Sequence, residues 1–283
     1  MYYYHVDVFS EQPMNGNGLI VVFPEKELET AILLKITREF RQFETIFVFP
    51  QNNDGSYTVR IFTMEEELAF AGHPILGAGA VLHRLIDNNK AKMRIRLRLP
   101  AKDIEIQSEL NDAGFVVTMD QGVPIHLGMV EKQFYPAIAE SLNIDLAQFN
   151  AGYPIEVVST GLPYLLVPVY NGIEKAKIVH LEFETFLNSF GAKFVYVFET
   201  ATLECRTWDN SGITEDVATG SAAGPLCAYL MENGLKKPGE IVEIHQGKYL
   251  GRPSIIRSWV EKENGHVRIQ GEVVFFGKGE IFI

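Results

Sequence analysis

One acidic residue, Glu44, has strongly apolar neighbours, in the segment Phe43-Glu-Thr-Ile-Phe-Val-Phe49. In a strand that begins there, its carboxyl group shares a face with Ile46 and Val48. Apolar neighbours disfavour the charged form of a carboxyl group and raise its pKa toward the range useful for general acid–base catalysis. The alternative, and the commoner arrangement for such an acid, is a carboxylate at a strand end that turns to solvent or caps a turn. Glu44 is therefore a candidate proton carrier that its local sequence alone does not establish.

Two segments share a pattern in which a glycine begins a helix of small residues. They read Gly72-His-Pro-Ile-Leu-Gly-Ala-Gly and Gly220-Ser-Ala-Ala-Gly-Pro-Leu-Cys, and aligning their first glycines places His73 opposite Ser221. Small residues on all sides, with few charges, indicate helices that are buried on most sides. The repeat predicts a strand-rich shell that encloses one buried helix and is built twice.

A glycine at a helix start exposes backbone N–H groups, and the helix dipole places partial positive charge there. If the starts at Gly72 and Gly220 face one another across a cleft, they form a site for a carboxylate or phosphate group without an arginine. The alternative is a pair of tight turns that serve close packing. Potential proton carriers or hydrogen-bonding groups lie beside both glycines and favour a site, namely His73, Asp216 and Ser221.

The elements that must position these residues are many short strands interrupted by a few helices. Apolar spacing predicts helices over 28–43, 134–142 and 221–233. Alternation and turn residues predict strands over 2–9, 45–50, 57–63, 93–99, 103–108, 115–120, 155–159, 164–169, 194–199 and 204–208. We expect two domains, one of residues 1–119 completed by a C-terminal strand at about 272–283, and one of residues 120–271.

Composition limits the classes of function. The chain has 283 residues, 47% of them hydrophobic, which at about 150 residues per domain predicts two folded domains. Thirty-six acidic against 25 basic residues give a net charge of −11, which disfavours binding to nucleic acids and to anionic membranes. Arg94, Arg96 and Arg98 alternate along one predicted strand, and we expect them to form a solvated face.

Other signals point away from secretion, metals and nucleotides. No apolar run approaches the ~20 residues that span a bilayer. Asp7 precedes any hydrophobic segment of signal-peptide length, so we expect a cytoplasmic protein. Cys205 and Cys227 are the two cysteines, and we expect both to be small buried side chains. The histidines are scattered, and the sequence lacks a P-loop or a dinucleotide-binding glycine motif, so neither a metal nor a nucleotide is indicated.

A series of short motifs extends over nearly the whole chain. In order, they are Asp7-Val-Phe9 with Gly16-Asn17, Glu44-Thr-Ile-Phe47, Arg60-Ile-Phe-Thr63, Phe70-Ala-Gly-His-Pro74, Gly212-Ile-Thr-Glu-Asp216, Thr219-Gly-Ser-Ala222, and Gln246-Gly followed by Gly251-Arg-Pro-Ser254. In this series the chain resembles the phenazine-biosynthesis (PhzF-like) isomerase family. The resemblance implies an α+β fold of the diaminopimelate epimerase type. Such a fold has two similar lobes, each a strand-rich barrel around a central helix, with the active site between them.

The resemblance also implies roles for individual residues. Glu44 is then the proton-transferring acid and base, and His73 and Asp216 hold and polarise the substrate. Gly72, Gly220 and Ser221 bind its carboxylate through backbone amides or a hydroxyl group, and Asn17 is a further substrate-binding residue. Proton transfer without a cofactor, a small carboxylate as substrate, and a homodimer are what such a family leads us to expect.

The chain departs from related patterns at three places. Met64 and Val217 stand where the family often has proline, which affects loop geometry more than chemistry. Epimerases of similar fold carry a cysteine just before the glycine of each repeat, whereas here Ala71 precedes Gly72. A two-thiol racemase is therefore disfavoured.

Three hypotheses remain. The first is an isomerase that moves a proton within a small carboxylated substrate and so shifts a double bond. The second is an epimerase in which Glu44 is one base and Asp216 or His73 is the other. The third is a protein of the same fold that binds a ligand without catalysis.

Overall fold

Polar and apolar residues alternate along several strands, so that one face of each strand is buried. The computed structural model, which describes residues 1–100 and 102–283, shows this clearly in strand β6 (Lys92–Arg98). Met93, Ile95 and Leu97 are buried, while Arg94 and Arg96 are exposed. The predicted solvated face of arginines is confirmed.

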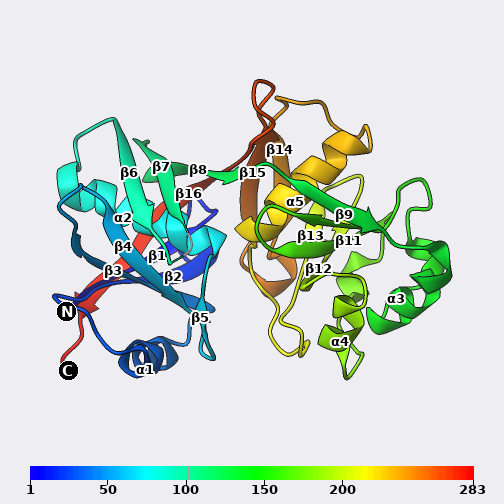
Figure 1. The fold of residues 1–283 in the computed structure, drawn as a ribbon, viewed down its shortest axis with the longest axis horizontal. Coiled ribbons are helices and arrows are strands. Elements are labelled where there is room, and N and C mark those ends of the chain that lie inside the picture. Colours follow the sequence, from blue (N-terminus) through cyan, green and yellow to red (C-terminus); the bar gives the residue numbers. More distant parts are fainter. Residues whose placement is uncertain (101) are drawn as a thin grey trace. The chain divides into compact units, whose positions relative to one another are not determined.

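The chain divides into two units. The first unit consists of Met1–Asp120 and Gln270–Ile283, and the second of Gln121–Ile269. The chain passes from one unit to the other within strands β8 (Phe115–Gly122) and β16 (Val267–Glu280) (Figure 1).

The first unit is a closed ring of strands. Its remaining elements are β1 (Tyr2–Val8), β2 (Asn17–Phe23), α1 (Thr30–Phe40), β3 (Glu44–Gln51), β4 (Tyr57–Phe62), β5 (Glu67–Leu68), α2 (Gly72–Asp87) and β7 (Asp103–Leu110). The strands are hydrogen-bonded in the order β1-β2-β3-β4-β6-β7-β8-β16, and β1 also pairs with β16, which closes the barrel. The N–H of Ile281 donates to the carbonyl of Met1 (2.8 Å), so the two chain ends lie side by side.

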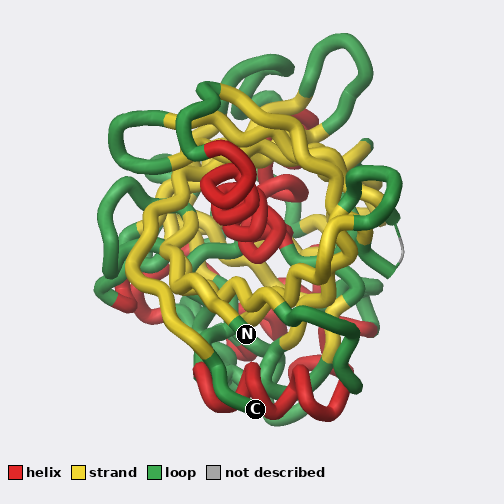
Figure 2. Tube along the Cα trace, turned by 90° about the vertical axis from the view of Figure 1, so that its left-hand side faces the viewer, coloured by secondary structure: helices red, strands yellow, loops and turns green. Residues whose placement is uncertain are grey.

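Helix α2 lies inside this ring, as Figure 2 shows. It packs against β1, β2, β3, β6 and β7, and every residue from Gly72 to His83 is buried. A Cβ atom on Gly77 would come within 2.3 Å of Cδ2 of Leu19, so the missing side chain lets β2 approach the helix closely. Burial on all sides confirms the sequence-based expectation for this helix.

The second unit is built around α5 (Gly220–Glu232). Its other elements are β9 (Ile125–Met129), α3 (Tyr135–Ser141), β10 (Glu156–Ser159), β11 (Pro163–Val169), α4 (Phe183–Asn188), β12 (Phe194–Glu199), β13 (Glu204–Arg206), β14 (Val242–Gln246), β15 (Ser254–Val260) and the 3₁₀ turns Lys132–Phe134, Leu146–Gln148, Ile173–Lys175 and Lys248–Leu250. From β16 the strand order is β15-β14-β13-β12-β11-β10-β9. Helix α5 packs against β10, β11 and β15, and residues 222–230 are all buried.

Both units repeat one pattern of strand pairing. The pairs β1–β2, β3–β4 and β6–β7 are antiparallel and β2–β3 and β4–β6 are parallel. Likewise β10–β11, β12–β13 and β14–β15 are antiparallel, while β11–β12 and β13–β14 are parallel. Helices α2 and α5 occupy equivalent places in the two series and begin at the predicted glycines, Gly72 and Gly220. The predicted internal repeat is confirmed.

The observed elements differ from the predicted ones in several places. Strand β5 and helix α4 were not predicted, and the helix predicted over 28–43 covers Thr30–Phe40. Helix α1 begins at Thr30, and Leu28 packs against its apolar face from the preceding loop. Strand β9 was not predicted, because all five of its residues are exposed and give no alternating pattern. None of the described helices has the length and apolar character needed to cross a membrane.

Candidate functional site

Glu44 is the first residue of β3, and its carboxyl group is buried. The parallel pairing of β2 and β3 sets it beside Leu19, and the residue is only 6% exposed. The alternative of a carboxylate turned to solvent is therefore wrong. Oε2 of Glu44 lies 3.4 Å from Nδ1 of His73, so the candidate proton carrier contacts one of the other predicted site residues.

His73 is the second residue of α2 and is 4% exposed. Burial disfavours its charged form and lowers its pKa to about 3. The imidazole is therefore neutral at physiological pH. Nδ2 of Asn17, at the start of β2, lies 3.4 Å from Nδ1 of His73. The structure thus gathers Asn17, Glu44 and His73 within the first unit.

The other ring nitrogen of His73 is free to bind a ligand. An amide nitrogen can only donate, so the tautomer that accepts from Asn17 at Nδ1 carries the proton of the neutral ring on Nε2. Nε2 is buried and has no hydrogen-bond partner among the described residues. A buried donor without a partner is costly, and a substrate oxygen is a chemically suitable acceptor for it.

The first turn of α2 adds backbone donors to the same region. Ala71 precedes the helix in an extended conformation, and no side chain caps the helix start. The first N–H groups of a helix have no carbonyl partner within it, and Pro74 fits there because it lacks an N–H. The backbone N–H groups of Gly72 and His73 are therefore suited to an anion.

The depressed pKa of His73 predicts a pH-dependent stability. Between pH of about 3 and 6.5, an unfolded chain protonates this histidine whereas the folded chain does not. The free energy of unfolding should therefore rise with pH across this window and gain nothing from His73 above it. Urea unfolding of wild type and His73→Gln at pH 4.5, 5.5 and 7.5 measures this, and we expect a shallower rise in the variant. Exposed His180→Gln is the control, and equal slopes for wild type and His73→Gln would contradict the assignment.

Asp216 of the second unit is held by a buried network. It is 6% exposed, and its Oδ2 accepts a hydrogen bond from the Thr219 hydroxyl (2.5 Å). Gln246, from β14, donates through Nε2 to the carbonyl oxygen of Asp216 (2.8 Å) and to the Thr219 hydroxyl (3.0 Å). Its Oε1 accepts from the Thr219 N–H (3.1 Å) and the Tyr196 hydroxyl (2.9 Å). Both donors and both acceptor positions of one amide thus fix the segment that leads into α5.

Gly247 makes this arrangement possible. Its φ is +82°, and a Cβ atom would lie 2.3 Å from the carbonyl oxygen of Arg252 and 2.8 Å from that of Val217. A side chain does not fit there, and the left-handed backbone conformation also favours glycine. The pair Gln246-Gly therefore has a structural cause, because the amide and the absent side chain both bring the loop at Asp216 and Val217 against β14.

Gly220 and Ser221 form the first turn of α5. Ser221 Oγ shares a hydrogen bond of 2.7 Å with the hydroxyl of Tyr164, and Nε2 of Gln121 donates to the carbonyl of Gly220 (2.9 Å). No side chain caps this helix either, so its first N–H groups match those of α2 in character. Sequence reasoning gave no role to Gln246, Tyr164 or Gln121, although Gln246 belongs to one of the motifs that carry the family resemblance.

Both cysteines are buried, as predicted. Burial raises the pKa of the Cys205 thiol well above its usual range and that of Cys227 to about 12. Neither thiol is a ready nucleophile or base in this state. No group of three or more histidine, cysteine, aspartate or glutamate side chains within residues 1–100 and 102–283 is arranged to hold a metal ion.

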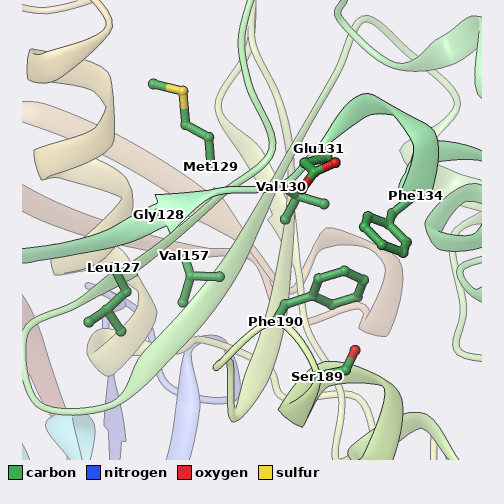
Figure 3. A pocket seen from close by; sticks show the side chains of 9 residues that line it. All are labelled: Leu127, Gly128, Met129, Val130, Glu131, Phe134, Val157, Ser189 and Phe190. Atoms are coloured by element: carbon green, nitrogen blue, oxygen red, sulfur yellow. The ribbon is translucent and has the colours of Figure 1, made fainter.

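A hollow of about 220 Å³ on the second unit is of a different kind. It is lined by Leu127, Gly128, Met129, Val130, Glu131, Phe134, Val157, Ser189 and Phe190. In Figure 3 the rings of Phe134 and Phe190 lie next to each other, and their centroids are 5.5 Å apart. None of the predicted site residues lines this hollow, so it is not the candidate site.

The chain is similar to known proteins over nearly its whole length. Residues 6–279 match the family model described as phenazine biosynthesis-like protein. The trans-2,3-dihydro-3-hydroxyanthranilate isomerase of Pseudomonas fluorescens is 31% identical over 287 aligned residues, which cover 99% of each chain.

Several solved structures share the fold. A predicted epimerase from Pseudomonas aeruginosa superposes with a TM-score of 0.94 at 41% identity, covering 100% of this chain and 99% of that one. A PhzF-family protein from Bacillus anthracis superposes with a TM-score of 0.85 and the same coverage. At 23% identity, this comparison shows a shared fold only.

Proposed function

Because this chain belongs to the family of phenazine biosynthesis-like proteins and is an isomerase, we propose that it moves a proton within a small carboxylate and so shifts a double bond. The relative from Pseudomonas fluorescens is named for its action on trans-2,3-dihydro-3-hydroxyanthranilate. That compound is a partly reduced ring with one carboxylate. Cyclic carboxylates of this size are the substrate class of the proposal.

The buried contact between Glu44 and His73 carries the proposal. An acid that is 6% exposed lies 3.4 Å from a neutral imidazole, whose second nitrogen has no partner among the described residues. A structural ion pair needs a charged histidine, whereas burial keeps this one neutral. Such a pair fits one group that transfers a proton beside another that donates a hydrogen bond.

The proposed reaction balances without an external reagent. The Glu44 carboxylate takes a proton from one carbon of the substrate, the double bond moves, and the same carboxyl group returns a proton to another carbon. Nε2–H of His73 stabilises the negative charge that develops on the substrate by donating a hydrogen bond. No electron donor or acceptor is consumed, so a cofactor is not part of the proposal.

The remaining site residues bind the substrate in this proposal. Asn17, Gly72, Gly220 and Ser221 are the substrate-binding residues, through backbone N–H groups or polar side chains. Asp216 holds and polarises the substrate through hydrogen bonds. The net charge of −11 does not oppose this, because helix starts act on an anion at hydrogen-bond range while distant surface charges are screened.

An epimerase is the second candidate, favoured by the predicted epimerase at 41% identity. It requires one base on each face of a carbon, with Glu44 and either Asp216 or His73 in those roles. A thiol pair is disfavoured, because both cysteines are buried with raised pKa values. The third interpretation, a binding protein without activity, is disfavoured by isomerase relatives that align over the full chain.

Incubating the wild-type protein with trans-2,3-dihydro-3-hydroxyanthranilate and following the ring protons by NMR tests the proposal. A product with a migrated double bond supports the isomerase. Inversion at one carbon with the double bond in place supports the epimerase. A bound but unchanged compound, in a screen that also includes other cyclic carboxylates, would contradict both.

We extend the proposal to a homodimer, supported by the edge strand β9. Ile125, Leu127 and Met129 are 59%, 53% and 67% exposed, and β9 is the last strand of the described sheet. An apolar sheet edge of this kind is suited to pairing with a second copy. Light scattering should give a dimer for wild type and a monomer for Leu127→Lys, with exposed Leu181→Lys as the control. A monomeric wild type would contradict this part.

A further inference from the structure

In each unit, an arginine on the strand equivalent to β4 forms a pair with a glutamate of the loop before the central helix, and the two pairs have the same geometry. In the first unit, Arg60 of β4 donates from Nε to Oε1 of Glu67 (2.7 Å) and from Nη2 to Oε2 (2.5 Å). In the second unit, Arg206 of β13 donates from Nε to Oε1 of Glu215 (2.8 Å) and from Nη2 to Oε2 (2.6 Å). Two parallel charge-assisted bonds fix both the distance and the orientation of the carboxylate.

The two pairs occupy equivalent places in the internal repeat. Strands β4 and β13 correspond in the order of strand pairing, and each precedes its unit's central helix. Glu67 precedes Gly72 by five residues, as Glu215 precedes Gly220. When Gly72 is aligned with Gly220, Glu67 therefore falls on Glu215, although neither glutamate lies in a helix.

The rest of each guanidinium is also used in the same way. Nη1 of Arg60 donates to the carbonyl of Leu28 (3.4 Å), and the guanidinium lies 5.2 Å from the ring centroid of Phe62, two residues on. Nη1 of Arg206 donates to the carbonyl of Ile173 (2.9 Å), and its guanidinium lies 4.9 Å from Trp208, again two residues on. In both units the arginine therefore binds its glutamate and also a backbone carbonyl that is distant in the sequence.

The glutamate ends of these pairs fix the loops that lead into the helix starts. Glu67 pairs with Phe62, so that the loop folds back on β4. Glu215 forms a bridge with Trp208, and the N–H of the next residue, Asp216, donates to the carbonyl of Thr207 (3.0 Å). Holding Glu215 therefore holds the backbone of Asp216.

The second pair is the more deeply buried. The side chains of Arg206 and Glu215 are each 10% exposed, against 18% and 26% for Arg60 and Glu67. Removing one partner of a buried pair leaves an uncompensated charge, and the loop must move to give that charge water. The loop most sensitive to such a change is the one that carries Asp216.

We infer that Arg206 and Glu215 are positioning residues that hold Asp216 and the start of α5 in the substrate-binding conformation. Arg60 and Glu67 are their counterparts for Gly72 and His73. This inference rests on the proposed function, because it assigns a purpose to loops that bind the substrate there. Neither pair touches the reacting atoms, and each acts through the backbone of its loop.

The test compares R206Q, E215Q and the double variant R206Q/E215Q. A displacement of about 1 Å at a substrate-binding group lowers the rate by about 10²-fold, so we expect kcat/KM for trans-2,3-dihydro-3-hydroxyanthranilate to fall by about that factor in each. The double variant should lose no more than the single ones, because the residues act as one unit and removing both leaves no uncompensated charge. KM should rise as well, which a smaller folded fraction alone does not cause. R60Q should show the same trend with a smaller fall.

E243Q is the matched control, since Glu243 accepts from Nε of Arg257 (2.9 Å) in the same unit and is half exposed. It should keep wild-type kcat/KM. Amide hydrogen exchange over residues 213–221 is the second readout, and it should be faster in R206Q and E215Q but not in E243Q. Exchange needs no turnover, so it decides this inference even if wild type fails to convert the compound. A folded R206Q protein with wild-type KM and wild-type amide exchange would overturn the inference. If R206Q does not fold, the same result in R60Q, with exchange measured over residues 64–73, would overturn it.

Discussion

Replacing Glu44 by glutamine is expected to lower kcat about 10²- to 10⁴-fold, the usual contribution of a general acid–base group. Glutamine has nearly the same volume and keeps a polar group at the 6%-exposed position at the start of β3. It cannot take up and return a proton in the required way. The structure therefore predicts that kcat falls while the substrate still binds, which steady-state kinetics with the proposed substrate, trans-2,3-dihydro-3-hydroxyanthranilate, can measure.

Glu105→Gln provides the control for this experiment. Glu105 lies on the exposed face of β7, where its side chain is 65% exposed and paired with Arg94 at 3.7 Å. We expect it to keep wild-type kcat. If Glu44→Gln retained wild-type kcat, Glu44 would be a buried structural acid, and the general base would have to be sought elsewhere.

Replacing Gln246 by leucine is expected to have the second largest effect. Leucine keeps most of the volume but leaves the carbonyl of Asp216 and the N–H of Thr219 without their buried partner. Each buried polar group that loses its partner costs about 1–3 kcal/mol, so the free energy of unfolding should fall by several kcal/mol. The loop at Asp216 should also lose its fixed position, and activity should fall more than the folded fraction does.

Urea unfolding and kinetics on the same preparation separate these two effects. Gln107→Leu is the matched control, because Gln107 donates one bond to the partly exposed side chain of Glu109 (2.7 Å). It should lose little stability and no activity. A Gln246→Leu protein with wild-type stability would show that the four hydrogen bonds of this amide do not fix the loop.

The sequence contained the information for the repeat but not for the contacts that support it. Gly72 and Gly220 could be aligned because the small residues of a buried helix follow each of them at short range. The partners of Gln246 are Tyr196, Asp216 and Thr219, which lie up to 50 residues away. Only the order of strands in the sheet brings them together.

For Glu44, the local sequence suggested the chemistry but did not determine whether the carboxyl group is buried. Its apolar neighbours suggested a perturbed acid, but the commoner arrangement was an exposed strand end. The parallel register of β2 and β3 and the position of α2 inside the barrel bury the Glu44 carboxyl group. They also place Nδ1 of His73 3.4 Å from Oε2 of Glu44. Both are non-local, since parallel strands pair through a connection that the local pattern does not specify.

The pairing of Arg60 with Glu67 and of Arg206 with Glu215 could not be predicted from the local sequence either. Arg60 stood within a quoted motif, but its equivalence to Arg206 depends on the matching of β4 with β13. The spacing from arginine to helix glycine also differs by two residues between the units. The sequence alone offers two regularities, a glutamate five residues before each glycine and an aromatic residue two positions after each arginine.

Proton exchange by NMR in deuterated water tests the central claim most directly. Wild type and Glu44→Gln are each incubated with trans-2,3-dihydro-3-hydroxyanthranilate, and the loss of substrate ring protons and the gain of product are followed together. We predict that wild type forms the double-bond isomer and that Glu44→Gln neither exchanges the migrating proton nor forms product at a comparable rate. Exchange in Glu44→Gln as fast as in wild type would contradict the assignment of Glu44 as the group that moves the proton.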